Sequence, residues 1–187
     1  SDLTVVDRWA VGRSSSEWTM VSDIGLAASL IAPAVYLGLE SLVLPTQHAF
    51  RDFAGDLLVI SEAMALTTAF ATVLKFAVRR PRPARYSAVD APFATFDQEL
   101  SFPSGHVSMV AAATTALTMT VFYRHPKSPM RWVVLASSVA LTLVTAAGRV
   151  EGGHHFPTDV LMASMICAFS GFAVPYLHFF FNDAAPT

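Results

Sequence analysis

The sequence predicts an all-α fold: a polytopic membrane helical bundle with about five transmembrane helices and an N-terminal interfacial helix. Of its 187 residues, 53% are apolar and only 14% are charged, and the mean hydropathy is +0.50. A soluble domain carries about 25% charged residues. The apolar residues also gather in five long blocks. A hydrocarbon core about 30 Å thick takes about 20 residues of helix, so the blocks are interpreted as membrane spans.

In chain order, the expected spans are residues 24–44, 57–78, 107–123, 132–147 and 160–181. The third and fourth blocks are short for a span, so we expect the residues of the motifs beside them, described below, to extend these helices. A soluble five-helix bundle is the alternative. It would need charged outer faces, and these blocks are apolar nearly all round.

Residues 1–23 precede the first block and are expected to form the interfacial segment. Four apolar side chains fall on one face of a helix there: Val5, Val6, Trp9 and Ala10. Trp9 would lie at the level of the lipid headgroups. Ser14 and Glu17 have the spacing of a capping box at the start of the first span. The segment lacks the features of a signal peptide, and because the sequence begins with Ser we expect a segment upstream.

No internal repeat or linker divides the chain, so we expect a single domain, 1–187, with a motif-bearing core at 75–159. The apolar, charge-poor composition argues against a nucleic-acid partner, while the near balance of 12 basic and 14 acidic residues says little about partners. The single Cys167 excludes an intramolecular disulfide and a Cys-rich zinc site. The third block carries small residues spaced for close helix packing: Ser108, Ala112 and Ala116.

With five spans, residues 79–103 and 148–158 meet on one face of the membrane. Basic residues collect at that face: Lys75, Arg79, Arg80, Arg82, Arg85 and Arg149. We assign Lys75, Arg82 and Arg149 to phosphate binding, because their charge and forked donors suit phosphate oxygens. For the other three arginines, a topology signal or a lipid headgroup contact is the favoured interpretation.

Two helix starts on the same face suit an anion. Pro103 and Pro157 each read as a proline in the first turn of a helix. The open N–H groups and partial positive charge at a helix N-terminus bind phosphate readily. We therefore expect two such N-termini and the surrounding cations to form a pocket for a phosphoryl group.

Two histidines complete this predicted pocket. His155 lies four residues before Asp159, so the carboxylate can orient the imidazole as a nucleophile. His106, at the other helix start, can serve as the general acid for the leaving oxygen. A metal site made by His106, His154 and His155 is the alternative for these residues.

These residues fall into three motifs, and together the motifs resemble the type 2 phosphatidic acid phosphatase (PAP2) superfamily. Lys-x6-Arg-Pro matches Lys75 through Arg82-Pro83, and Pro-Ser-Gly-His matches residues 103–106. Ser-Arg-x5-His-x3-Asp matches Arg149, His155 and Asp159, with Gly148 in place of the Ser. One motif alone is weak, but three in order at helix ends are specific.

The resemblance implies a role for each residue. His155 would form a phosphohistidine, Asp159 would orient it, and His106 would protonate the leaving alkoxide. Groups that resemble the family's phosphate ligands would hold the oxygens: Lys75, Arg82, Ser104, Gly105 and Arg149. The resemblance implies neither a metal ion nor a cofactor.

The expected function is therefore hydrolysis of a lipid phosphomonoester or of the terminal phosphate of a lipid diphosphate. The candidate substrates are phosphatidic acid, phosphatidylglycerol phosphate, undecaprenyl diphosphate and a lipid A phosphate. A lipid phosphotransferase with the same site and a non-catalytic transport or scaffold protein are the alternatives. Soluble vanadium haloperoxidases also resemble these motifs, but the five apolar blocks argue against them.

The surroundings of the site give two further expectations. The loop from Ala84 to Leu100 carries Tyr86, Phe93 and Phe96, and is long enough to cover the site and select the lipid. Residues 124–131 are basic, so the positive-inside rule places them in the cytoplasm. The active face of an inner-membrane protein would then face the periplasm, in contact with membrane lipids. The oligomeric state stays open.

Overall fold

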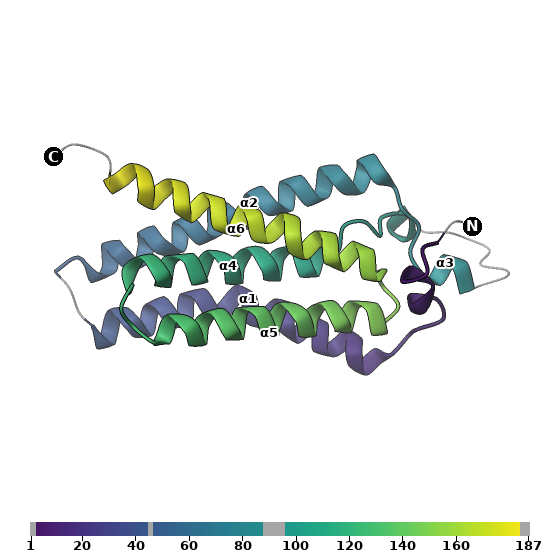
Figure 1. Cartoon of the computed structure of the whole chain (residues 1–187), viewed down its shortest axis with the longest axis horizontal. Helices are drawn as coiled ribbons and strands as arrows, with labels where there is room; N and C mark the ends of the chain where they lie inside the picture. Colours follow the sequence, from purple (N-terminus) through teal and green to yellow (C-terminus); the bar gives the residue numbers. More distant parts are fainter. Residues whose placement is uncertain (1–2, 45–46, 88–95, 184–187) are drawn as a thin grey trace.

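The computed structural model describes residues 3–44, 47–87 and 96–183, and five long helices run lengthwise through it (Figure 1). They are α1 (Ser16–Val43), α2 (Ala49–Val78), α4 (Gly105–Arg124), α5 (Met130–Glu151) and α6 (Pro157–Asp183). The short elements are η1 (Asp7–Ala10), α3 (Ala84–Ser87) and η2 (Phe96–Glu99). All five long helices are long and apolar enough to cross a membrane, which confirms the predicted fold class. As expected, the motif residues extend the third and fourth spans.

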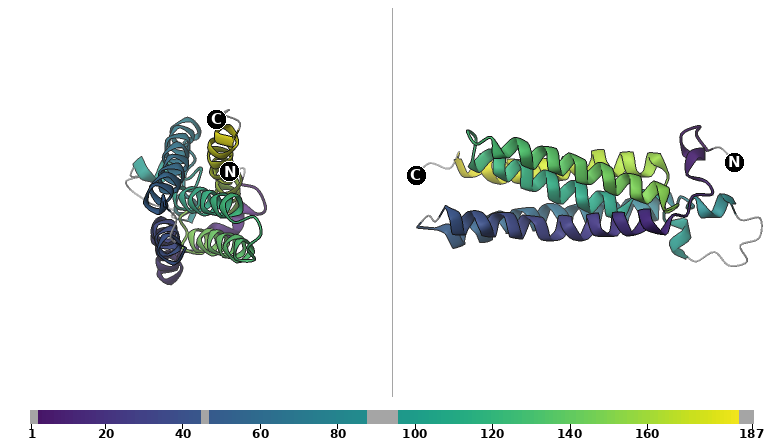
Figure 2. Two further views of the ribbon diagram at one scale, coloured as in Figure 1. Left: turned by 90° about the vertical axis from the view of Figure 1, so that its left-hand side faces the viewer. Right: turned by 90° about the horizontal axis from the view of Figure 1, so that it is seen from below.

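Helix α4 lies in the middle of the bundle, with α1, α2, α5 and α6 around it (Figure 2, left). In its most apolar stretch 67% of the residues are buried, against 17–33% in the other four helices. Its small residues Ser108, Ala112 and Ala116 are all buried, which confirms their predicted role in packing. Small side chains let helix backbones approach closely, and that contact drives helix association in lipid.

Two glycines mark the closest approaches between helices. A Cβ atom on Gly171 of α6 would lie 2.5 Å from the carbonyl oxygen of Ala112 in α4. A Cβ atom on Gly148 of α5 would lie 2.7 Å from the carbonyl oxygen of Trp18 and 2.8 Å from Cβ of Ser22, both in α1. Gly148 is the position at which the third motif has Ser, so the packing of α1 against α5 explains this departure.

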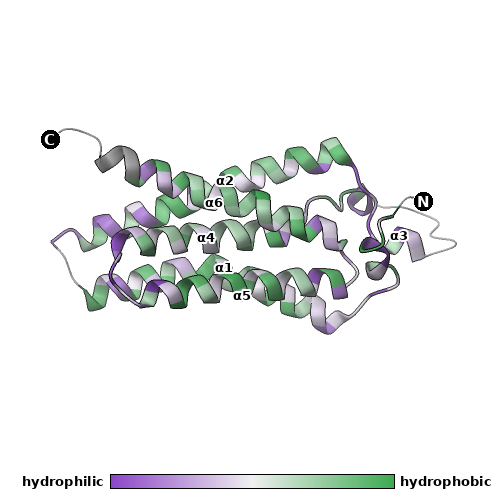
Figure 3. Ribbon diagram, in the orientation of Figure 1, coloured by the Kyte–Doolittle hydropathy of each residue, from purple (hydrophilic) through white to green (hydrophobic). Residues whose placement is uncertain are grey.

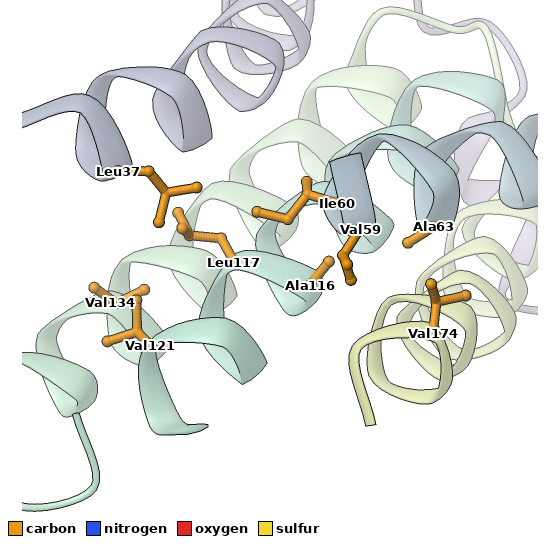
Figure 4. Close-up of a cluster of buried hydrophobic side chains, with 9 residues drawn as sticks. All are labelled: Leu37, Val59, Ile60, Ala63, Ala116, Leu117, Val121, Val134 and Val174. Atoms are coloured by element: carbon orange, nitrogen blue, oxygen red, sulfur yellow. The ribbon is translucent and has the colours of Figure 1, made fainter. Parts of the chain in front are cut away.

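Apolar residues occupy the middle of the bundle, and polar residues gather at its two ends (Figure 3). One buried cluster joins α1, α2, α4, α5 and α6 (Figure 4): Leu37, Val59, Ile60, Ala63, Ala116, Leu117, Val121, Val134 and Val174. A second cluster packs η1 against α4, α5 and α6: Ala10, Val107, Val150, Phe156, Val160 and Ala163. The second cluster therefore fixes the N-terminal segment to the helix ends that carry the motifs.

The N-terminal segment differs from its prediction. Helix α1 begins at Ser16, so the segment before the first span ends well short of residue 23. The N-cap is Ser15 rather than Ser14, and its Oγ accepts a hydrogen bond from the backbone N–H of Trp18 at 3.3 Å. The predicted interfacial helix is a single 3-10 turn, η1.

The predicted apolar face of this segment is also wrong in part. Val5, Val6 and Trp9 are exposed, as an interfacial role requires, but Ala10 is buried in the second cluster. Asp7 is buried as well, with 1% of its surface exposed. A buried carboxylate must be paired or hydrogen-bonded, so its partners identify what the segment does.

Candidate active site

Four helix ends meet at one end of the bundle: the end of α2, the start of α4, the end of α5 and the start of α6 (Figure 1). The residues of the three motifs lie on these ends and on the connections beside them: Lys75, Arg82, Ser104, Gly105, His106, Arg149, His155 and Asp159. The short elements η1, α3 and η2 lie at the same end. The motif residues, although up to 84 positions apart in the sequence (159 − 75 = 84), thus share one site.

The His155 imidazole is held by a backbone carbonyl. Its Nδ1 lies 2.7 Å from the carbonyl oxygen of Ser101 and 3.9 Å from Oδ2 of Asp159. A carbonyl oxygen can only accept a hydrogen bond, so Nδ1 must carry the ring proton. In the neutral ring Nε2 is then unprotonated, which is the form a nucleophile needs. The orienting contact that the sequence assigned to Asp159 is made by Ser101.

The surroundings of His155 keep it neutral. Burial, together with the positive charges of Arg82 and Arg149, lowers the pKa of His155 to about 4 from 6.5. The nearby carboxylate of Asp159 acts in the opposite direction and is outweighed. The imidazole, with only 2% of its surface exposed, is therefore uncharged throughout the neutral pH range.

Asp159 acts on His155 through Ser101. It is fully buried and accepts hydrogen bonds from Ser101 Oγ at 2.5 Å, Arg80 Nη1 at 2.6 Å and the backbone N–H of Phe156 at 2.9 Å. Ser101 binds Asp159 through its side chain and His155 through its backbone carbonyl. The carboxylate of Asp159 therefore holds Ser101 in position, and the carbonyl of Ser101 in turn holds the imidazole of His155.

Arg80 is the main residue that the sequence interpretation missed. Its guanidinium bridges Asp159 and Asp7, with 2.8 Å between Nη2 and Oδ2 of Asp7, and lies 4.2 Å above the ring of Phe156. The prediction of a topology or lipid contact is therefore wrong for Arg80. An arginine that neutralises a buried carboxylate next to His155 belongs to the site.

The prediction that the start of α6 is open to phosphate is wrong, because Asp7 occupies it. Oδ1 of Asp7 accepts hydrogen bonds from the backbone N–H of Thr158 at 3.2 Å and from its hydroxyl at 2.9 Å. Burial alone would raise the pKa of Asp7, but the hydrogen bonds from Arg80 and Thr158 lower it. The N-terminal segment therefore supplies a permanent anion to this helix end.

The start of α4 is the helix end that remains for a phosphoryl group. Its N-cap is Ser104, so Pro103 precedes the cap instead of lying in the first turn. Ser104 Oγ is buried and makes no capping hydrogen bond. Within the described part of the chain, this atom and Nε of the buried Arg149 have no hydrogen-bond partner. Buried polar atoms are nearly always paired, so these two call for a ligand or water.

The cations beside this helix end have exchangeable partners. Lys75 Nζ donates to the carbonyl oxygen of Leu100 at 2.8 Å. Arg82 Nη2 pairs with the carboxylate of Asp97 at 2.9 Å, and this carboxylate is 75% exposed. A Cβ atom on Gly105 would lie 3.9 Å from Cε of Lys75, so Lys75 borders the start of α4. A phosphate could replace the neutral carbonyl or the exposed carboxylate.

A second residue missed by the sequence interpretation, Asp23 of α1, contacts both His106 and Arg149. Its Oδ1 lies 3.0 Å from Nε2 of His106 and 3.3 Å from Nη1 of Arg149. The signal available in the sequence was a lone carboxylate at the edge of an apolar span, where a charge is a functional hypothesis by default.

His154 points away from the proposed nucleophile. Its Nε2 lies 3.1 Å from Oγ1 of Thr19, and burial together with Arg149 lowers the pKa of His154 to about 4. Among residues 3–44, 47–87 and 96–183, no three His, Cys, Asp or Glu side chains are grouped to hold a metal ion. The alternative of a metal site at His106, His154 and His155 thus has no geometric support there.

The loop expected to cover the site is described only at its two ends. Tyr86 packs edge-on against Phe156, with ring centroids 5.7 Å apart, and Phe96 stacks on Phe76 at 5.9 Å. Phe93 lies outside the described residues. Tyr86 thus contacts the residue that follows His155, while Phe96 packs on the last turns of α2.

Comparison with known proteins agrees with this geometry. The family model described as the PAP2 superfamily matches residues 56–183, more than half of the chain. Among solved structures, the chain resembles "the first transmembrane PAP2 type phosphatidylglycerolphosphate phosphatase from Bacillus subtilis". The TM-score is 0.63 at 21% sequence identity, over 97% of this chain and 84% of that one, which establishes a shared fold. No curated protein sequence gives a significant match.

Proposed function

The chain belongs to the PAP2 superfamily, and from this membership we propose that it is an integral membrane lipid phosphatase. Its reaction is hydrolysis of a lipid phosphomonoester or of the terminal phosphate of a lipid diphosphate. One observation carries the proposal: the unprotonated Nε2 of His155 shares a site with two buried polar atoms, on Ser104 and Arg149, that have no hydrogen-bond partner among the described residues. A phosphoryl group supplies the acceptor oxygens that these two atoms lack.

In the first step, Nε2 of His155 attacks phosphorus and the bond from phosphorus to the lipid oxygen breaks. His106 gives its proton to that oxygen, so the lipid leaves as an alcohol, or as a monophosphate when the substrate is a diphosphate. The negative charge on the three remaining oxygens is stabilised by Lys75, Arg82 and Arg149, together with Ser104 and the N–H of Gly105.

In the second step, water attacks the phosphohistidine. Neutral His106 takes a proton from this water, the bond between phosphorus and Nε2 breaks, and inorganic phosphate leaves. Both histidines then return to their starting protonation states. Arginines, a lysine and one helix N-terminus provide the charge stabilisation that phosphoryl transfer requires, so the proposed reaction uses neither a metal ion nor a cofactor.

The substrate class follows from the membrane location of the site. The candidates remain phosphatidic acid, phosphatidylglycerol phosphate, undecaprenyl diphosphate and a lipid A phosphate. The fold shared with a phosphatidylglycerolphosphate phosphatase makes that lipid the first to try. A phosphotransferase, in which a second lipid alcohol replaces water in the second step, would use the same residues.

We further propose one domain over residues 1–187, in the inner membrane, with the active end toward the periplasm.

The test is phosphate release by the full chain in detergent, with EDTA present and short-chain phosphatidic acid as substrate. The wild type should release phosphate, and vanadate should inhibit it by forming a pentacoordinate analogue of the transferring phosphoryl group. His155→Ala should lower kcat by ~1,000-fold or more. His125→Gln, at the opposite end of the bundle, is the matched control and should remain active. Full activity of His155→Ala would refute the proposed mechanism, and release only with an added divalent metal would refute the metal-free reaction.

A further inference from the structure

The strongest feature outside the three motifs is the carboxylate of Asp23, which touches two site residues from a helix that carries none of the motifs. Asp23 lies in the second turn of α1, and 55% of its side chain is exposed. Its Oδ1 is 3.0 Å from Nε2 of His106 and 3.3 Å from Nη1 of Arg149. A carboxylate accepts hydrogen bonds only, so Nε2 of His106 must carry a proton in this contact.

We propose that Asp23 is a positioning residue for His106, the general acid of the reaction: Asp23 holds the imidazole in place and favours its protonated form over the neutral one. The inference rests on the proposed function, in which His106 protonates the leaving oxygen. An imidazolium bound to a carboxylate through Nε2 keeps a second N–H, at Nδ1, for that oxygen. When the proton has been given up, Nε2–H stays bonded to Asp23 and the neutral ring stays in place.

The other charged groups around His106 make such a partner necessary. Those that face it are Asp23 from α1, Arg149 from α5, Arg82 from the connection after α2, and His154 from the connection before α6, with Lys75 of α2 at the adjoining turn. All except Asp23 are cations or neutral, and each cation disfavours a proton on His106. Asp23 is the acidic group of this set, so it opposes the positive field that phosphate binding requires.

The packing of α1 supports a fixed position for Asp23. The neighbouring residue Ser22 is fully buried, its Oγ lies 3.4 Å from Nη1 of Arg149, and its backbone lies against Gly148. Because Ser22 is clamped against α5, the next residue has little freedom to move along the site. A carboxylate held by a rigid helix can orient an imidazole better than one on a loop.

The test uses two leaving groups, because a general acid matters only when the leaving group is a strong base. The substrates are short-chain phosphatidic acid and p-nitrophenyl phosphate. The diacylglycerol oxygen of the first is a strongly basic alkoxide that needs a proton to leave, whereas the p-nitrophenolate of the second leaves without one. For the alkoxide substrate, Asp23→Asn should lower kcat by about 10- to 100-fold, with KM unchanged or lower. With p-nitrophenyl phosphate, kcat should change little. The alkaline limb of the kcat profile should also move to lower pH, because the carboxylate that favours a proton on His106 is gone.

Three variants make the outcome decisive. Asp23→Glu keeps the charge and should recover part of the kcat that Asp23→Asn loses. If Asp23→Asn does not fold, Asp23→Glu takes its place in the comparison. Glu17→Gln removes an exposed acid from the same helix and should leave both activities unchanged. His106→Gln should reproduce the dependence on the leaving group.

The results separate this inference from the proposed function. If His106→Gln shows no dependence on the leaving group, the role of His106 fails and the proposed mechanism with it. If His106→Gln shows the dependence but Asp23→Asn loses activity equally with both substrates, Asp23 is merely structural and the inference alone is overturned. A rise of kcat/KM with both substrates in Asp23→Asn would also overturn it, because Asp23 would then compete with phosphate for Arg149.

Discussion

The two ends of the bundle both carry ion pairs, but the two ends differ in how completely the donors and acceptors of these pairs are satisfied. At the end opposite the motifs, Arg124 of α4 donates two hydrogen bonds to the buried Asp56 of α2, at 2.7 and 3.0 Å. Beside it, Nε2 of His125 lies 2.7 Å from Oε1 of Glu40. At the motif-bearing end, Arg149 reaches Asp23 with one nitrogen at 3.3 Å, and its Nε is unpaired among the described residues.

The difference distinguishes charges that hold helices together from charges that are available to the proposed substrate. A bidentate pair such as that of Arg124 and Asp56 satisfies both partners, so a ligand has nothing to gain there. At the motif-bearing end, the partners of Lys75, Arg82 and Arg149 include a neutral carbonyl and exposed carboxylates, and among the described residues Nε of Arg149 has none. That incomplete pairing costs stability, which is expected where structure serves function.

The largest effect on activity should appear when one ion-paired arginine is replaced at each end of the bundle and the two variants are compared. We expect Arg149→Gln to lower kcat/KM by about 100-fold or more, because a charged donor to the phosphoryl oxygens is lost. Arg124→Gln should keep kcat/KM but destabilise the fold by roughly 1–3 kcal/mol, because Asp56 is left buried and unpaired. Phosphate release and thermal unfolding in one detergent measure both. Equal losses of activity in the two variants would erase the distinction between the ends.

The next effect concerns the support of the nucleophile. Arg80→Gln should lower kcat by about 10- to 100-fold with little change in KM, because Asp159 and then Ser101 lose their fixed positions. Arg79→Gln is the matched control, since Arg79 is exposed and its Nε hydrogen-bonds back to the carbonyl oxygen of Phe76 in α2. Steady-state kinetics on a short-chain lipid phosphate distinguishes the two. If both variants behave alike, Arg80 acts at the lipid surface.

The acid limb of the activity profile should report the burial of His155. With a pKa of about 4, His155 is unprotonated above that pH and becomes protonated, and inactive, below it. The limb due to His155 in kcat/KM should therefore have its midpoint near pH 4 rather than 6.5. The second ionisation of the substrate phosphate, near about 6, is fitted separately. A histidine limb that stays near 6.5 would mean that the imidazole is solvated.

The smallest effect on activity should come from the helix contact beneath the site. Gly148→Ser restores the residue of the family motif, but its Cβ would collide with Trp18 and Ser22. We expect a loss of roughly 1–3 kcal/mol in stability, as for other overpacked contacts. Gly55→Ser is the control, since a Cβ atom there meets nothing within 4 Å. Equal unfolding temperatures for the two variants would show that α1 is free to move away from α5.

The sequence was a good guide wherever the signal is local. Blocks of apolar residues predicted five spans because helix length and bilayer thickness are both fixed quantities. Counting the spans then put the three motifs at one end, and the structure has them there. The small residues of α4 could be recognised because helix spacing alone places them on one face.

The sequence did not reveal a residue's role where that role depends on a distant partner. Arg80 looked like a lipid contact because its partner Asp7 lies 73 positions away, and Asp23 escaped notice because His106 lies 83 positions away. The carbonyl of Ser101 could not have been found, since a backbone oxygen has no signature in the sequence. The choice between Ser14 and Ser15 as N-cap is a difference of one residue that patterns rarely resolve.

By itself, then, the sequence determined that this is a five-span helical membrane protein with the PAP2 motifs at one end, because hydropathy and motif spacing act over a few turns of one helix. The tertiary structure alone decided which groups complete the site. Asp7 caps α6, Arg80 and Ser101 support Asp159 and His155, and Asp23 meets His106. The physical reason is that ion pairs form over 3–4 Å, a distance set by how closely the helices pack.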